Sequence, residues 1–292
     1  MKNGFLVFLA SFVVLGGSWC GFVLAPVLQL GGQQQTTILN SSDVYPVGRP
    51  GEANQGLQVY RANGCAACHT EQIQQEGVAC EIDLTSAGKN SAAVEDATQK
   101  IVEQVSLTNP KAAEIETLRP AGSPKPILIS VTKEEADAAA QDIAAVGGKT
   151  EIQIYATGLD ISRGWGLRHS VAEDFLYDDP VQLGSVRIGP DLADVGTRRP
   201  DVNWQLLHLY SPQSVVNGSA MPPFRYLFRV QKIGGEPSPD ALDLPKGFAP
   251  PAGYEVVPTA KAQELAAYLL SLQADVPLHD APFTQPPAVS KP

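Results

Sequence analysis

The 292-residue sequence has few of the residues that usually carry chemistry: four cysteines, four histidines, two methionines and three tryptophans. It also lacks an excess of positive charge, since 31 acidic residues against 21 basic ones give a net charge of −10. A protein that binds nucleic acid needs a basic face, so this composition argues against nucleic acid as a partner. A structural zinc site needs four Cys or His ligands, usually in two pairs. The sequence has one Cys-x-x-Cys pattern and no His-x-x-x-His pattern, so the second pair is missing.

One long apolar run lies near the N-terminus, where residues 4–28 include no charged side chain. At about 1.5 Å per residue in a helix, this run is long enough to cross a hydrocarbon core of about 30 Å. A cleaved signal peptide is the alternative, but Val23 and Ala25 make a poor cleavage site and Pro26 would follow the cut. We therefore expect a retained transmembrane anchor.

The basic residues around this run predict its orientation. Lys2 precedes the run, and the next Lys or Arg after it is Arg49. Under the positive-inside rule, the N-terminus lies in the cytoplasm and the chain after residue 30 lies on the other side. We expect a single-pass protein of the bacterial inner membrane whose folded part is periplasmic.

Three of the cysteines and histidines occur within five residues, in the sequence "GCAACHT" at residues 64–70. Cys65, Cys68 and His69 form a Cys-x-x-Cys-His run, which is the attachment sequence of a c-type haem. Two sulfurs one helical turn apart can bond to both vinyl groups of the porphyrin, and the histidine that follows can ligate the iron. A thioredoxin-like redox pair needs no such histidine. The run therefore predicts one covalently bound haem c.

A haem iron held by one histidine needs a second axial ligand or keeps an open position. Apart from the initiator, the sequence has a single methionine, Met221, within "GSAMPPF". The two prolines that follow it restrict the backbone and would hold the thioether in one orientation. We expect Met221 to be the sixth ligand, with His208 and His169 as the competing residues.

Amphipathic helices are expected before and after these residues. Leu57 and Tyr60 are three residues apart ahead of Gly64, and "KAQELAAYLLSLQ" at residues 261–273 places its apolar residues on one stripe. Such a pair is typical of a class I cytochrome c domain, in which the first and last helices cross. The predicted fold class is mainly α.

The composition changes between residues 81 and 157, where the sequence has no Cys, His, Trp, Met or Phe and carries twelve acidic against seven basic residues. Within it, "PILISVTKEEADAAAQDIAAVGGKTEIQIY" is typical of a strand, a helix, a glycine turn and a second strand. Thr132 and Glu135 have the spacing of a capping box at the start of that helix. We interpret this stretch as a small α+β insertion without chemistry of its own.

These patterns divide the chain into an anchor, a linker, an interrupted domain and a tail. The predicted ranges are a transmembrane anchor at 1–30, a linker at 31–50, a cytochrome c domain at 51–80 and 158–273, the insertion at 81–157 and a proline-rich tail at 274–292. Cys20 lies in the anchor and Cys80 beside the insertion, so the two are not expected to form a disulfide.

The order of the motifs resembles a known family. The sequences "GSVRIGPDLADVG" at residues 184–196 and "WQLLHLYSPQSVVNGSAMPPFRYL" at 204–227 are similar to the monohaem cytochrome c subunit of cbb3-type cytochrome c oxidases. That family has one N-terminal membrane helix and an early Cys-x-x-Cys-His run ahead of these segments. The resemblance covers about residues 1–80 and 160–275, and the insertion and the tail depart from it.

The resemblance implies roles for further residues. The carbonyl of Pro190 would accept a hydrogen bond from His69, as in class I cytochromes c. Trp204 and His208 would lie near the haem edge. Ser185 would lie at the contact with the catalytic subunit, beside a bound calcium ion. The four haem-binding residues would be Cys65, Cys68, His69 and Met221.

The resemblance also implies a function. The chain would take electrons from another c-type cytochrome, either a subunit or a carrier, and pass them to the catalytic subunit of a membrane haem–copper oxidase. It would not be an enzyme by itself. The alternatives are the cytochrome c subunit of a nitric oxide reductase, and a c-haem enzyme or sensor with a displaceable axial ligand.

Overall fold

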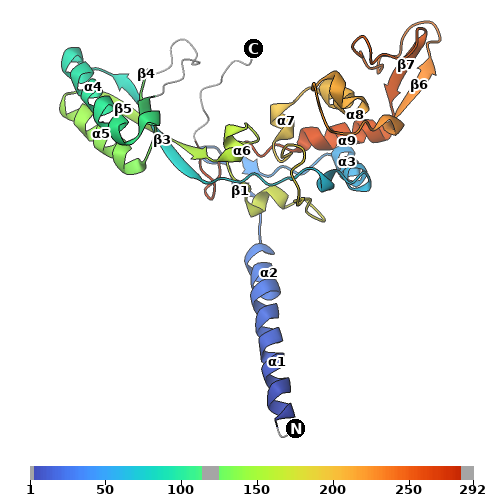
Figure 1. The fold of residues 1–292 in the computed structure, drawn as a ribbon, viewed down its shortest axis with the longest axis horizontal. Helices are drawn as coiled ribbons and strands as arrows, with labels where there is room; N and C mark the ends of the chain where they lie inside the picture. The colour runs from blue at the N-terminus through green and yellow to red at the C-terminus, as the bar shows by residue number, and fades with distance from the viewer. Residues whose placement is uncertain (1–2, 114–124, 284–292) are drawn as a thin grey trace.

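The computed structural model describes residues 3–113 and 125–283. Lys2, part of the predicted insertion (114–124) and the end of the predicted tail (284–292) lie outside the described residues. Figure 1 shows an isolated N-terminal helix below two lobes. We call residues 33–76 and 158–283 the helical lobe, and residues 77–157 the α+β lobe.

The N-terminal helix is continuous from Gly4 to Leu30. It consists of α1 (Gly4–Trp19), a π-helical turn (Cys20–Leu24) and α2 (Ala25–Leu30). The π-helical turn directly precedes Pro26, whose ring would clash with the carbonyl four residues earlier in a regular α-helix. Among the described residues, this is the one helix that is long and apolar enough to cross a membrane, with 27 residues and a mean hydropathy of 2.1.

Two helices pack against each other at the centre of the helical lobe, α3 (Gly51–Ala62) and α9 (Ala260–Ser271). A Cβ at Gly56 would lie 1.9 Å from the backbone oxygen of Glu264, so this close approach requires glycine. The rings of Tyr60 and Tyr268 are 5.1 Å apart beside it.

Short elements complete the helical lobe. They are α6 (Leu159–Ser162), α7 (Val195–Arg198), α8 (Val202–Tyr210), and an antiparallel hairpin of β6 (Phe228–Lys232) and β7 (Tyr254–Pro258). Apolar side chains of α7, α8, β6 and β7 join those of α3 and α9 in one core, while Ile161 of α6 packs on a smaller cluster with Ile73. A helix-rich lobe beside a membrane-length helix agrees with the predicted fold class, whereas the class I cytochrome c fold itself stays a prediction.

The α+β lobe contains a three-stranded sheet in the order β4 (Lys125–Val131), β3 (Gly77–Ser86), β5 (Lys149–Thr157), with both outer strands antiparallel to β3. Helices α4 (Ser91–Thr108) and α5 (Lys133–Ala145) pack on this sheet and share its apolar core. The predicted capping box is present, because the N–H of Glu135 donates to Thr132 Oγ1 (3.2 Å) and the N–H of Thr132 donates to Glu135 Oε2 (2.9 Å).

The start of the α+β lobe differs from the sequence-based boundary at residue 81. Strand β3 begins at Gly77, which lies opposite Thr157 on β5. Cys80 is buried in the core of this lobe and does not belong to the cytochrome segment 51–80. Composition missed these residues because the strand begins before the acidic, chemistry-poor stretch does.

Parts of the predicted linker and tail fold onto the helical lobe. Short strands β1 (Thr36–Thr37) and β2 (Val44–Tyr45) pair with each other, and the N–H of Leu39 donates to the carbonyl of Pro277 (2.9 Å). Four apolar side chains of the predicted tail are buried: Ala274, Leu278, Ala281 and Phe283. These segments are therefore parts of the lobe and not separate appendages.

A buried arginine joins the linker, the lobe and the tail. Arg168 is fully buried and donates from Nε to the carbonyl of Val276 (2.7 Å). Its two terminal nitrogens donate to the carboxylate of Asp174 (3.0 and 2.7 Å), which also accepts a hydrogen bond from Tyr45 Oη (2.8 Å). One ion pair thus connects three segments that are far apart in the sequence.

Candidate haem site

Helix α3 ends directly before the Cys-x-x-Cys-His run. Gly64 has a φ of +68°, which glycine adopts without strain, and it turns the chain into a 3₁₀ helix over Cys65–Ala67. The N–H of His69 donates to the carbonyl of Cys65 (3.0 Å), so one turn holds the predicted haem-binding residues together. Both thiols are free. Burial raises the pKa of Cys65 to about 12, so this thiol is protonated at neutral pH.

The ring of His69 is held by the segment around Pro190. Its Nδ1 lies 2.8 Å from the Pro190 carbonyl oxygen. Because a carbonyl can only accept, Nδ1 carries the proton and Nε2 keeps a free lone pair. Gly189 lies against the ring, where a Cβ would be 2.2 Å from His69 Cε1. Burial lowers the pKa of His69, while the hydrogen bond to Pro190 opposes that shift. The imidazole is therefore neutral and has a nitrogen available for iron.

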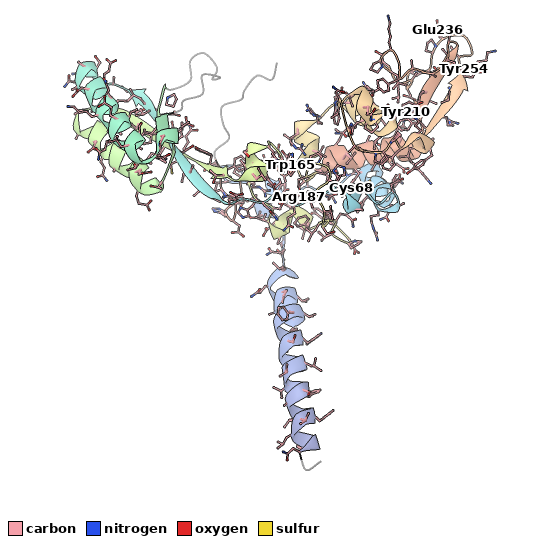
Figure 2. The ribbon with its side chains drawn as sticks, viewed as in Figure 1. Cys68, Trp165, Arg187, Tyr210, Glu236 and Tyr254 are labelled. Atoms are coloured by element: carbon pink, nitrogen blue, oxygen red, sulfur yellow. The ribbon has the colours of Figure 1, made fainter. Side chains whose placement is uncertain are left out.

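Sequence reasoning assigned no role to the charged residues that fix this segment. The carboxylate of Asp191 is fully buried and accepts a hydrogen bond from Thr70 Oγ1 (2.5 Å), one residue after His69. Arg187 donates to the same hydroxyl (2.9 Å) and to Asp160 Oδ1 (2.8 Å). Figure 2 shows Arg187 next to Trp165 in this region. Both charged residues, Arg187 and Asp191, are visible in the sequence "RIGPDL". Their spacing alone does not reveal which residues they contact in the fold.

The loop with Met221 lies on the same core as the cysteine turn. Met221 and Cys65 are both half-buried and pack against the apolar core of the helical lobe. Five residues after Met221, Tyr226 Oη donates a hydrogen bond to Asn63 Oδ1, at the C-terminal end of α3. The structure therefore brings the loop and the turn together, and Met221 as the sixth ligand stays a prediction.

The other two histidines considered as ligands differ in their surroundings, since His208 Nδ1 is buried without a hydrogen-bond partner among the described residues. On α8, the ring of His208 stacks on Trp204, with centroids 4.8 Å apart and planes 12° from parallel. Burial is the main cause that lowers the pKa of His208 to about 4, with a smaller electrostatic contribution from nearby His69, so the ring of His208 is neutral. His169 Nδ1 lies 2.9 Å from the side-chain oxygen of Gln75. Helix α8 thus lies close to the attachment turn, as the predicted haem surroundings require.

Ser185 lies on the surface beside the attachment turn. The residue before it, Gly184, has a φ of +69°, and a Cβ there would be 2.2 Å from the carbonyl oxygen of His69. Ser185 itself is exposed. Within residues 3–113 and 125–283, no group of three or more His, Cys, Asp or Glu side chains could hold a metal ion.

The donor atoms at this site fit a c-type haem. Two free thiols stand one turn apart, the imidazole that follows them is neutral with a free Nε2, and a thioether packs on the same core. When bound, the haem would supply one-electron redox chemistry, which no side chain at this site has.

A family model described as "Cytochrome C oxidase, mono-heme subunit/FixO" matches residues 160–251. Residues 160–251 are thus similar to the FixO family. The match contains Ser185, Pro190, Trp204, His208 and Met221, and it begins after the Cys-x-x-Cys-His run. The resemblance predicted from the sequence is thus confirmed for this segment, which is that of a mono-haem cytochrome c oxidase subunit. No curated protein matches the chain.

Proposed function

We propose that this chain is the electron-transfer subunit of a membrane cytochrome c oxidase of the cbb3 type. It would receive electrons from a c-type cytochrome and pass them to the catalytic haem–copper subunit. The observation that supports this best is the hydrogen bond from His69 to Pro190. That bond joins the haem-attachment turn to the segment that matches the FixO family.

Four residues of the chain would bind the haem. Cys65 and Cys68 would bond to it covalently, and His69 would ligate the iron through Nε2 while Pro190 fixes the ring. Met221 would occupy the opposite axial position. With both axial positions filled by the protein, no open position for oxygen is left, so the chain would carry electrons and leave catalysis to its partner.

The location of the partner follows from two exposed features. The apolar helix from Gly4 to Leu30 would anchor the chain in the bacterial inner membrane, with the N-terminus in the cytoplasm and both lobes in the periplasm. Ser185 would lie at the contact with the catalytic subunit, where an interface calcium ion would take its other ligands from that subunit.

Substitution of Met221 tests the function most directly. Met221→Leu keeps the volume of the side chain but removes the thioether. Covalent haem should persist through the two thiols, the ferric spectrum should lose its low-spin form, and the reduction potential should fall because the thioether no longer favours Fe(II). Met221→His should restore a low-spin spectrum at a lower potential. A low-spin, high-potential haem in Met221→Leu would show that another residue is the ligand, with His208 the first to examine.

Purification of the complex from native membranes tests the partner. A haem–copper oxidase subunit that reduces oxygen should co-purify with the chain. Recovery of a nitric oxide reductase subunit in its place would support the alternative function.

A further inference from the structure

Two segments of the helical lobe contain no acidic residue, although the chain as a whole carries a net charge of −10. They are residues 53–70, which contain the haem-attachment turn, and residues 202–235, which contain Met221. Their charged side chains are all positive. We call these four side chains the cationic rim: Arg61, Arg225, Arg229 and Lys232.

The cationic rim is exposed and unpaired. All four side chains are exposed, and none of them forms an ion pair with any of residues 3–113 or 125–283. Arg61 makes only a long hydrogen bond to Gln58 (3.4 Å), and Arg225 lies over the ring of Tyr210, 5.4 Å from its centroid. In a chain with ten excess negative charges, these four exposed cations have no ion-pair partner among the described residues and are available to the carboxylates of another molecule.

An exposed aromatic side chain lies within the rim. Tyr226 is 68% exposed, yet its hydroxyl is fixed by the hydrogen bond to Asn63, two residues after Arg61. Tyrosine and arginine are the side chains most enriched at the energetic centres of protein interfaces. Because its orientation is already fixed, Tyr226 would lose little conformational entropy when a partner binds.

Two residues of the rim, Arg229 and Lys232, lie on the hairpin that is remote from the anchor. In Figure 1 the β6–β7 hairpin is at the far side of the lobe from α1 and α2, and Figure 2 shows Tyr254 and Glu236 on that hairpin. Strand β6 carries Arg229 and Lys232. These two residues are therefore poorly placed to meet the headgroups of the membrane that the anchor would cross, and a periplasmic protein is the partner that they fit.

We propose that the cationic rim is the docking surface for the electron donor, and that the donor presents an acidic face to it. This inference rests on the proposed function and adds the charge and position of the donor's contact. It reverses what the overall charge of the chain suggests, since an acidic protein would be expected to attract a basic partner. Long-range attraction between the two faces would raise the rate of encounter at low ionic strength.

Charge reversal on β6 tests the proposal without knowledge of the donor. The test variant is Arg229→Glu/Lys232→Glu, and the matched control is Lys89→Glu/Lys149→Glu, which changes two exposed lysines of the α+β lobe. The ferrous, haem-loaded protein is oxidised either by the trianion hexacyanoferrate(III) or by the trication tris(phenanthroline)cobalt(III). In each reaction the iron loses one electron and the oxidant gains it.

The ratio of the two second-order rate constants reports the charge around the haem. At low ionic strength, the test variant should lower the anion-to-cation rate ratio by about tenfold, and the control should leave it unchanged. At about 1 M salt the difference should vanish, because the screening length falls to about 3 Å. Poly-L-glutamate, a model acidic polypeptide, should bind to the wild type at low salt and not to the test variant.

The outcomes separate this inference from the proposed function. An unchanged rate ratio in a chain that still supports oxidase turnover would overturn the docking surface alone. Binding to phosphatidylglycerol vesicles that depends on the rim would also overturn it, by showing a lipid contact. A chain that never acquires covalent haem would overturn the proposed function instead.

Discussion

The two lobes of this molecule are held together in different ways. The α+β lobe is one continuous stretch of chain, held by the backbone pairing of β3 with β4 and with β5 and by the apolar core beneath them. The helical lobe is assembled from distant segments, since α3 packs on α9, Thr70 bonds to Asp191 and Tyr45 bonds to Asp174. Backbone ladders thus join the segments of the first lobe, whereas the second depends on side-chain hydrogen bonds between distant segments, which also position the candidate haem site.

The lobes also differ in the chemistry that they contain. The four predicted haem-binding residues all lie in the helical lobe, together with the buried carboxylates of Asp160 and Asp191. The α+β lobe has one cysteine, Cys80, and burial raises the pKa of its thiol. A buried, protonated thiol in an apolar core is unreactive. This contrast predicts that damage to the helical lobe alters the haem, whereas damage to the α+β lobe does not.

The largest expected effect comes from the buried ion pair of the helical lobe. Arg168→Leu should destabilise that lobe by about 3–5 kcal/mol, because it leaves the carboxylate of Asp174 buried without its cation. Amide hydrogen exchange followed by mass spectrometry should show faster exchange across the helical lobe. The α+β lobe should keep its protection.

An exposed ion pair of the α+β lobe provides the control. Lys133 and Asp137 form an ion pair on the solvent side of α5, with both side chains about half exposed. Lys133→Ala should change the stability of the α+β lobe very little, because solvent screens this exposed pair. Equal losses of protection from the two substitutions would refute the view that buried ion pairs stabilise the helical lobe more than exposed pairs stabilise the α+β lobe.

The same contrast explains what the sequence could predict. The capping box at Thr132 and the glycine turn after it depend on neighbours within a few residues, so the elements around them were predictable. The attachment turn was predictable for the same reason. The partners of Arg187 and Asp191 were not, because Thr70 and Asp160 are brought to them by the tertiary fold. Docking of the predicted linker was missed likewise, since nothing local to Tyr45 indicates that its hydroxyl bonds to Asp174.

A glycine in each lobe gives a sharper comparison. Gly189→Ala should displace the ring of His69, because the new Cβ would lie 2.2 Å from Cε1. Covalent haem should remain, but the low-spin fraction and the reduction potential should both fall. Gly147 has a φ of +92° with no atom near its Cβ position, so Gly147→Ala should cost about 1–2 kcal/mol through backbone strain alone. The haem spectrum of Gly147→Ala should match that of the wild type. An altered spectrum would show that the α+β lobe influences the haem.

The smallest expected effect on the haem is that of removing the α+β lobe altogether. Gly77 and Thr157 lie opposite each other as the last pair of the β3–β5 ladder, so the chain leaves and re-enters the helical lobe at one point. An Asn-Gly pair in place of residues 78–156 would close this gap as a two-residue hairpin, the turn that such a pair favours. The hydrogen bond from the N–H of Glu76 to the carbonyl of Thr157 (2.9 Å) would be retained at its base.

The shortened chain should attach haem and show the wild-type spectrum and potential, because no predicted haem ligand lies between residues 78 and 156. The position of the cut matters. Removal of residues 84–155 would follow the sequence-based boundary more closely. Cys80 and Ile82 are buried in the core of the α+β lobe, and this cut would remove the strands and helices that cover them. That variant should aggregate because it exposes an unpaired apolar strand. If replacement of residues 78–156 by Asn-Gly abolished haem attachment, the α+β lobe would be part of the haem site, and the two lobes would not be functionally separate.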